Sequence, residues 1–215
     1  MNEMLKEGTD YSLKYENNVN AGTGKVTITF KGNYEGTVTK TFTINKRDIT
    51  KWMSSLSYTT TTYNGSAKKP TVTLKNSSNV VLDDEHYTVT YTNNVNAGKA
   101  TVTIKGKDNY TGTITKTFTI TTASISGKSA SLSYTSTTYD GTAEKPTVKI
   151  SGLTKDKDYT VAYKNNTSAG TATVTITGKG NYSGTITKTF TIKKASMTGI
   201  KVSGKEVTYN AKSHT

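Results

Sequence analysis

Three short sequence stretches recur in fixed order along the chain, and this repetition constrains the fold more than any other feature. A Tyr-x-Asn-Asn-x-x-Ala-Gly stretch occupies residues 15–22, 91–98 and 163–170. An Asn-Tyr-x-Gly stretch follows at 33–36, 109–112 and 181–184, and a Thr-Phe-Thr-Ile stretch closes each copy at 41–44, 117–120 and 189–192. The Asn-Asn and Asn-Tyr pairs are 16 residues apart every time, which indicates one small module repeated in tandem.

The length of the repeat varies at one place. The three closing phenylalanines are 76 and 72 residues apart. We assign the difference to residues 76–85, because loops tolerate changes in length better than strands do.

Apolar residues and threonines alternate within each copy. In residues 171–177, Val174 and Ile176 fall on one face and threonines on the other, and residues 185–192 alternate in the same way. A period of two predicts strands with one buried face. The turn residues at 181–184 predict that these two strands form a hairpin. Further strands are expected at residues 129–139, 146–150 and 159–163.

The strand count favours a small all-β module. About five strands are expected per copy, whereas a full immunoglobulin domain has about seven strands in about 100 residues. The 46 threonines and only 2 prolines agree with an all-β chain, because branched side chains pack well on a pleated sheet. We predict tandem small immunoglobulin-like β-sandwich modules, and a β-grasp-like module is the alternative that the period leaves open. The expected parts are a partial repeat at 1–46, complete repeats at 47–121 and 122–193, and a partial repeat at 194–215.

Composition argues against several kinds of partner. The chain has no cysteine, which excludes disulfides and thiolate metal sites. Its formal charge of +13 comes from lysines scattered through every repeat, with Arg47 the only arginine. Since base and phosphate recognition rely heavily on arginine, we expect no nucleic acid partner. No apolar run approaches the roughly 18 residues of a membrane span, so we expect no membrane insertion.

Several motifs resemble those of a known class of surface repeats. The sequence has Tyr-Asn-Gly at 63–65, Tyr-Asp-Gly at 139–141, Asp-Tyr-x-Val-x-Tyr at 158–163, and a recurring Gly-Asn-Tyr-x-Gly-Thr-x-x-x-x-Phe-Thr-Ile pattern. This set resembles the Tyr-Asp-Gly type tandem repeats of bacterial cell-surface proteins and adhesins, over essentially the whole chain. The resemblance implies extracellular stalk modules on a cell surface or cell wall. It implies no catalytic residues.

Candidate chemistry is sparse. The two histidines, His86 and His214, do not recur with the repeat. The acidic groups at 83–85 and 156–158 could offer oxygen ligands to calcium, but neither has the loop length of a dedicated site. The recurring tyrosines (Tyr34, Tyr110 and Tyr182; Tyr63, Tyr139 and Tyr209) could line a sugar-binding surface, although recurrence at the repeat period favours a structural role. We therefore expect no catalytic residue, cofactor or metal site.

One lysine per copy falls in phase with the apolar face, at Lys40, Lys116 and Lys188. A charge on a core-facing position is costly unless it is paired or reaches water. One interpretation is that each side chain extends past the sheet rim into solvent. The other is an intramolecular Lys–Asn amide crosslink, which needs a buried carboxylate nearby. Asp10 and Asp158 occupy matching positions, but His86 stands in the middle repeat.

These observations favour a non-catalytic stalk or spacer of a bacterial surface protein, with other domains of a larger protein as neighbours. The alternative is a module that binds a glycan, a host protein or an anionic cell-wall polymer through loops such as 76–85. The two partial repeats also match the two parts of one module, as residues 208–210 resemble 138–140 and residues 5–11 resemble 153–159. This predicts either a cut made without regard to the repeat or head-to-tail association of the chain with itself.

Overall fold

The computed structural model describes residues 4–199, 204 and 208–209. The chain divides into two compact units, residues 1–123 and 124–215. The first predicted partial repeat and the first predicted complete repeat both fall in unit 1, and the unit boundary lies two residues beyond the one expected at 121/122. Most of the predicted last part lies outside the described residues, at 200–203, 205–207 and 210–215.

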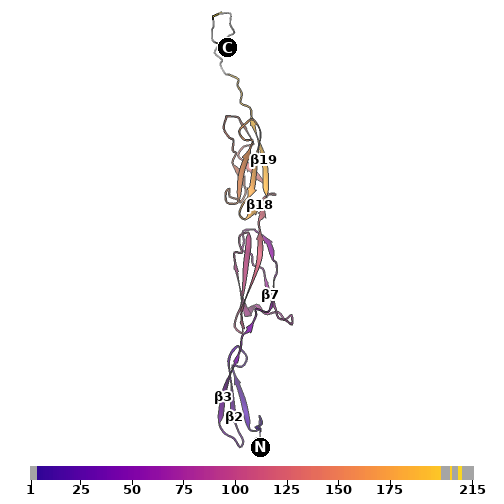
Figure 1. The fold of residues 1–215 in the computed structure, drawn as a ribbon, viewed down its shortest axis with the longest axis vertical. Coiled ribbons are helices and arrows are strands. Elements are labelled where there is room, and N and C mark those ends of the chain that lie inside the picture. Colours follow the sequence, from indigo (N-terminus) through magenta and orange to yellow (C-terminus); the bar gives the residue numbers. More distant parts are fainter. Residues whose placement is uncertain (1–3, 200–203, 205–207, 210–215) are drawn as a thin grey trace. The chain divides into compact units, whose positions relative to one another are not determined.

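Unit 1 begins with a three-stranded antiparallel sheet in the order β1-β2-β3. Its strands are β1 (Tyr11–Glu16), β2 (Gly22–Phe30) and β3 (Thr37–Ile44). Figure 1 shows β2 and β3 side by side, and their register sets threonine opposite threonine on one face and Ile28 opposite Val38 on the other. The expected alternation is therefore present in this sheet.

The rest of unit 1 is a sandwich of two sheets. A four-stranded sheet has the order β6-β11-β9-β8, and a two-stranded sheet pairs β5 with β7. Side chains from both sheets form one core that includes Leu74, Val102 and Phe118. The strands are β4 (Arg47–Asp48), β5 (Met53–Leu56), β6 (Thr60–Thr62), β7 (Val72–Lys75), β8 (Tyr87–Thr92), β9 (Gly98–Gly106), β10 (Tyr110–Thr111) and β11 (Thr113–Thr121).

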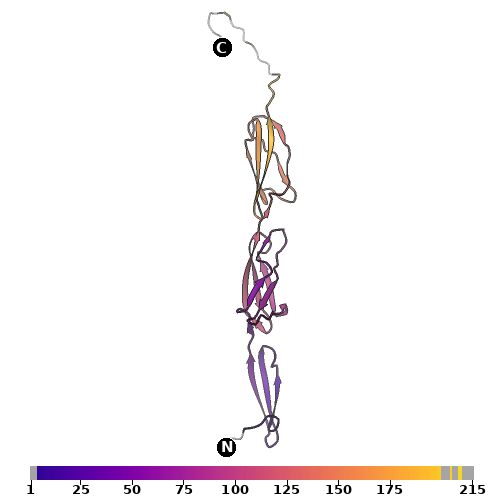
Figure 2. The same cartoon turned by 90° about the vertical axis from the view of Figure 1, so that its right-hand side faces the viewer.

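Unit 2 repeats this arrangement. Its four-stranded sheet has the order β14-β19-β17-β16, its two-stranded sheet pairs β13 with β15, and its core includes Val148, Val174 and Phe190. The long strands lie side by side in both ribbon views, in orange and yellow (Figures 1 and 2). The strands are β12 (Ala123–Ser124), which crosses the unit boundary, β13 (Ala130–Leu132), β14 (Ser136–Thr138), β15 (Val148–Ile150), β16 (Tyr159–Lys164), β17 (Gly170–Gly178), β18 (Tyr182–Ser183) and β19 (Thr185–Lys193).

The structure confirms the immunoglobulin-like sandwich and the hairpin around residues 181–184. In the described residues the only helical element is the short 3-10 turn η1 (Asp84–His86), so no helix packs across a sheet as a β-grasp module would require. The hairpin strands β17 and β19 pair antiparallel from Gly170 opposite Ile192 to Thr177 opposite Thr185.

The strand expected at 129–139 is instead two strands in different sheets. β13 pairs antiparallel with β15, whereas β14 pairs parallel with β19. Between them the Ser133 side chain accepts a hydrogen bond from the Thr147 amide at 2.9 Å, and the Thr147 carbonyl accepts one from the Ser133 amide. The segment thus changes sheets just after Ser133, which closes one side of the sandwich.

Candidate functional site

The Asn-Tyr-x-Gly turns are where the repeated motifs meet in space. In unit 1 the turn at 109–112 receives β4, which runs parallel to β10. The Arg47 amide donates to the Asn109 carbonyl at 2.8 Å, and the Ile49 amide donates to the Thr111 carbonyl at 3.0 Å. We call residues 33–36, 109–112 and 181–184 the receiving turns.

The segment that enters a receiving turn has its own compact form. Asp48 accepts hydrogen bonds from both the amide and the hydroxyl of Thr50, each at 2.8 Å. These bonds, led by the one from the amide, lower the pKa of the Asp48 carboxyl. Between them Ile49 is fully buried in the core. We call residues 48–50, and the matching 124–126 and 196–198, the entry turns.

Glycine is needed where an entry turn lies against a receiving turn. Gly112 has φ +96, and a Cβ there would collide with the Asp48 carboxylate and lie 2.8 Å from the Thr50 methyl group. Unit 2 contains the same contact, where a Cβ at Gly184 would collide with the Ser126 hydroxyl. The recurring glycine therefore makes room for the entry turn of its own module.

The Asn109 side chain also holds the preceding repeat. Its Oδ1 accepts a hydrogen bond from the Ala21 amide at 2.8 Å, and its Nδ2 donates to Asn20 Oδ1 at 2.9 Å. The loop that carries Ala21 begins at Asn17, whose φ of +53 lies in the left-handed region that asparagine tolerates. Within unit 1, the Asn-Asn-x-x-Ala-Gly motif of the first repeat and the Asn-Tyr-x-Gly motif of the next are thus two sides of one contact. Sequence reasoning missed this contact, although motif recurrence was a signal for it.

Tyrosines on the first long strand of each complete module are structural. The Tyr91 hydroxyl donates to the Pro70 carbonyl at 2.6 Å, and the Tyr163 hydroxyl donates to the Pro146 carbonyl at 2.7 Å. Burial raises the pKa of both phenols. Among the tyrosines singled out from the sequence, Tyr110 packs edge-on against Trp52 with ring centres 5.9 Å apart. Tyr34, Tyr139 and Tyr209 are exposed, and Tyr63 and Tyr182 pack against the two cores.

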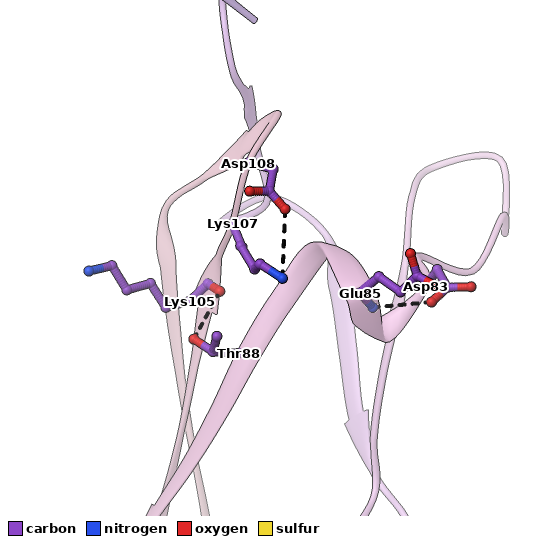
Figure 3. Close-up of polar contacts among 6 residues, drawn as sticks. All are labelled: Asp83, Glu85, Thr88, Lys105, Lys107 and Asp108. Carbon is purple, nitrogen blue, oxygen red and sulfur yellow. Dashed lines mark hydrogen bonds and ion pairs between the residues drawn. The ribbon is translucent and has the colours of Figure 1, made fainter. Parts of the chain in front are cut away.

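The acidic residues at 83–85 form a turn. Asp83 Oδ1 caps η1 by accepting a hydrogen bond from the Glu85 amide at 3.1 Å (Figure 3). Separately, the Lys107 ammonium group forms an ion pair with the Asp108 carboxylate at 3.8 Å. His86 lies against Tyr110 with ring centres 5.1 Å apart, while His214 lies outside the described residues. Within residues 4–199, 204 and 208–209, no three acidic or histidine side chains gather as a metal site would require.

In unit 2 the strand register separates Lys188 from Asp158, the carboxylate that a Lys–Asn crosslink would need nearby. Lys188 lies opposite Val174, which in turn pairs with Tyr163. Tyr159 lies four residues along β16 from Tyr163, so the two are roughly 13 Å apart at 3.3 Å per residue. Asp158 comes just before Tyr159 in the chain. Asp158 is engaged locally, because it accepts a hydrogen bond from the Thr154 amide at 2.8 Å.

The other two lysines occupy the same place in their sheets. Lys40 lies opposite Val26 and Lys116 lies opposite Val102. Lys40 and Lys188 are exposed and Lys116 is half-buried. This placement fits side chains that extend into water. The crosslink stays a prediction for mass measurement.

The loop at 76–85 carries the main difference between the two complete modules. Asn76 Oδ1 accepts hydrogen bonds from the amides of Ser78 and Val80, each at 2.9 Å, which fixes a tight turn. Val80 and Val81 are 59% and 56% exposed at its end. Unit 2 has no counterpart of this apolar pair in its sequence.

Comparisons with known proteins give little guidance. No family model matches the chain, and no curated protein matches it. Among solved structures, one described as "PcdhgB3 EC1-4 in 50 mM HEPES" aligns at 13% identity with a TM-score of 0.20, over 89% of this chain and 66% of that chain. A TM-score this low does not establish a shared fold. Among the described residues, no helix is long and apolar enough to cross a lipid bilayer.

Proposed function

We propose that the chain is a non-catalytic structural segment of a bacterial surface protein or adhesin, in which tandem modules serve as an extracellular stalk or spacer. The observation that carries the proposal is the repetition of the core. Phe118 and Phe190 are each 2% exposed at matching positions, and each packs edge-on against a matching tyrosine with ring centres 5.8 and 5.9 Å apart. A spacer needs the same fold in every copy, whereas a binding site needs only one copy to differ.

The contacts around the receiving turns suit this role. A stalk transmits position only if consecutive modules are joined by more than a flexible linker. The hydrogen bonds of Asn109 to Asn20 and Ala21 supply such a joint within unit 1. Small modules have small cores, and contacts between neighbours add stability to each.

A binding function is the second candidate, and the exposed Val80 and Val81 favour it. Exposed apolar side chains on a turn fixed by its own hydrogen bonds can contact a host protein or a glycan ring. This feature occurs in one complete module only, as a specific site would.

A binding screen of the 215-residue chain against glycans and host-surface proteins separates the two candidates. The stalk proposal expects no binding above a protein-free control at physiological salt. Retention by anionic wall polymers that vanishes with added salt would reflect the charge of +13 alone. Saturable binding that Val80→Asp abolishes, and that the exposed control Val19→Asp leaves unchanged, would replace the stalk with the binding module.

A further inference from the structure

The first repeat has a receiving turn that no described residue fills. Gly36 has φ +104, close to the +96 of Gly112 and the +86 of Gly184. A Cβ at Gly112 or Gly184 would collide with an entry turn, whereas a Cβ at Gly36 would meet nothing within 4 Å. The neighbouring Tyr34 is exposed, although its counterpart Tyr110 packs against Trp52.

The sheet beside this receiving turn is open on its apolar face. Val26 and Ile28 are only half-buried, while their counterparts Val102 and Ile104 are fully buried under the second sheet. Phe42 lies over Gly24 and remains 37% exposed. A hollow of about 460 Å³ lies on this face, lined by Leu5, Tyr11, Leu13, Tyr15, Val26, Ile28 and Phe30.

The other end of the described chain has an entry turn without a receiving turn. Ser196 and Thr198 bond to each other as the earlier entry turns do, with the Thr198 amide donating to Ser196 Oγ at 3.2 Å and the two hydroxyls 2.7 Å apart. The same amide bond, at 3.1 Å, joins Ser126 to Ser124. Between them Met197 is 71% exposed, whereas Ile49 and Ile125 at the same position are fully buried.

We propose that the entry turn at 196–198 of one chain occupies the receiving turn at 33–36 of a second copy of this chain. Met197 then enters the apolar face beside Ile28, as Ile49 does in its own module, and Ser196 and Thr198 lie over Gly36. The loop at Ser168 and Ala169, which matches Asn20 and Ala21, meets Asn33 of the second copy as Asn20 and Ala21 meet Asn109. The contact of an entry turn with its receiving turn is the one that Gly112 and Gly184 make in the two complete modules.

The contact joins unlike surfaces, so it does not close on itself. Among the described residues of each chain, one entry turn and one receiving turn are unoccupied, and a heterologous contact of this kind builds open chains of subunits. Burying Met197 against part of the apolar face of β1 to β3 supplies the driving force, since burial of such surface favours association. The inference goes beyond a stalk function and does not require it.

Sedimentation velocity of the 215-residue chain over a concentration series tests the proposal. The measurement belongs at about 0.15 M salt, where the Debye length is about 8 Å and repulsion between basic chains is screened. The average mass is expected to rise with concentration. A chain that remains a monomer throughout overturns the proposal.

Two variants remove one surface each, and each has a matched control. Met197→Asp alters a side chain that is 71% exposed and is expected to weaken association at least tenfold, while Val19→Asp, at an exposed apolar side chain on another loop, leaves it unchanged. Gly36→Ala fills the receiving turn and is likewise expected to weaken association at least tenfold. Its control is Gly141→Ala, at φ +88 with nothing within 4 Å, which introduces the same backbone strain away from any receiving turn.

Mixing the two variants gives the most specific result. The Met197→Asp chain keeps its receiving turn and the Gly36→Ala chain keeps its entry turn, so together they are expected to form dimers that grow no further. Circular dichroism confirms that each variant retains its β-structure. Association of Met197→Asp like that of the unmodified chain, or a mixture that stays monomeric, overturns the proposal.

Discussion

Truncating the buried phenylalanine of a complete module should unfold that module, while the same change in the first repeat should not. Phe118 is 2% exposed and packs edge-on against Tyr58. Removing a fully buried Phe side chain costs about 3–5 kcal/mol. Its module, residues 47–121, has 75 residues and a total stability of roughly 4–11 kcal/mol at typical values per residue. Phe118→Ala should therefore lower the melting temperature of its module by at least about 12 °C.

The first repeat supplies the control. Phe42 occupies the matching position but is 37% exposed and rests on Gly24, and in the described part of the chain no second sheet covers it. Phe42→Ala should cost less than Phe118→Ala, because a larger part of the Phe42 side chain is already in contact with water. Hydrogen exchange read by mass spectrometry assigns the loss of protection to each segment separately. Equal effects of the two substitutions, or unchanged melting of Phe118→Ala, would show that the inward face is assigned wrongly.

Three further predictions concern charged groups. The hydrogen bond with Lys25 is the main cause that lowers the pKa of Glu16 from 4.5 to about 2. This contact therefore stabilises the first sheet above pH 4.5, and its contribution is lost as the pH falls toward 2. NMR titration should find a Glu16 pKa of about 2, and a pKa near 4.5 would refute the contact. Burial, aided by the hydrogen bond to Glu144, raises the pKa of Tyr134 from 10.0 to about 12. Unit 2 should therefore lose stability as the pH rises from 10 to 12, and Tyr134→Phe should remove this fall in melting temperature. Intact mass should match the plain sequence, whereas a loss of one ammonia would show that Lys188 or a matching lysine is crosslinked.

Local patterns in the sequence predicted the long hairpins well. The alternation of Thr173, Val174, Thr175 and Ile176 fixes which face of β17 is buried, and the hairpin turn sets its register with β19. Such information lies within a few neighbouring residues, so it can be read without knowing the rest of the fold.

Contacts between distant residues were not predictable in the same way. The parallel pairing of Thr137 with Ile192 joins residues that share no local pattern, and it splits a stretch that reads as one strand. The bonds of Asn109 to Asn20 and Ala21 depend on how two repeats meet. Recurrence indicated that these residues matter, but a repeated motif does not reveal its partner.

Mechanical unfolding of single molecules tests the structural role most directly. If the two complete modules are independent load-bearing units of the same kind, pulling on the ends of the chain should produce two steps of similar force. Each step should lengthen the chain by about 23–25 nm less the span of the folded module, since about 70 released residues extend by roughly 3.3–3.6 Å each. A chain that extends smoothly without these two steps, or that yields as one large step, would contradict the account of repeated, separately folded modules.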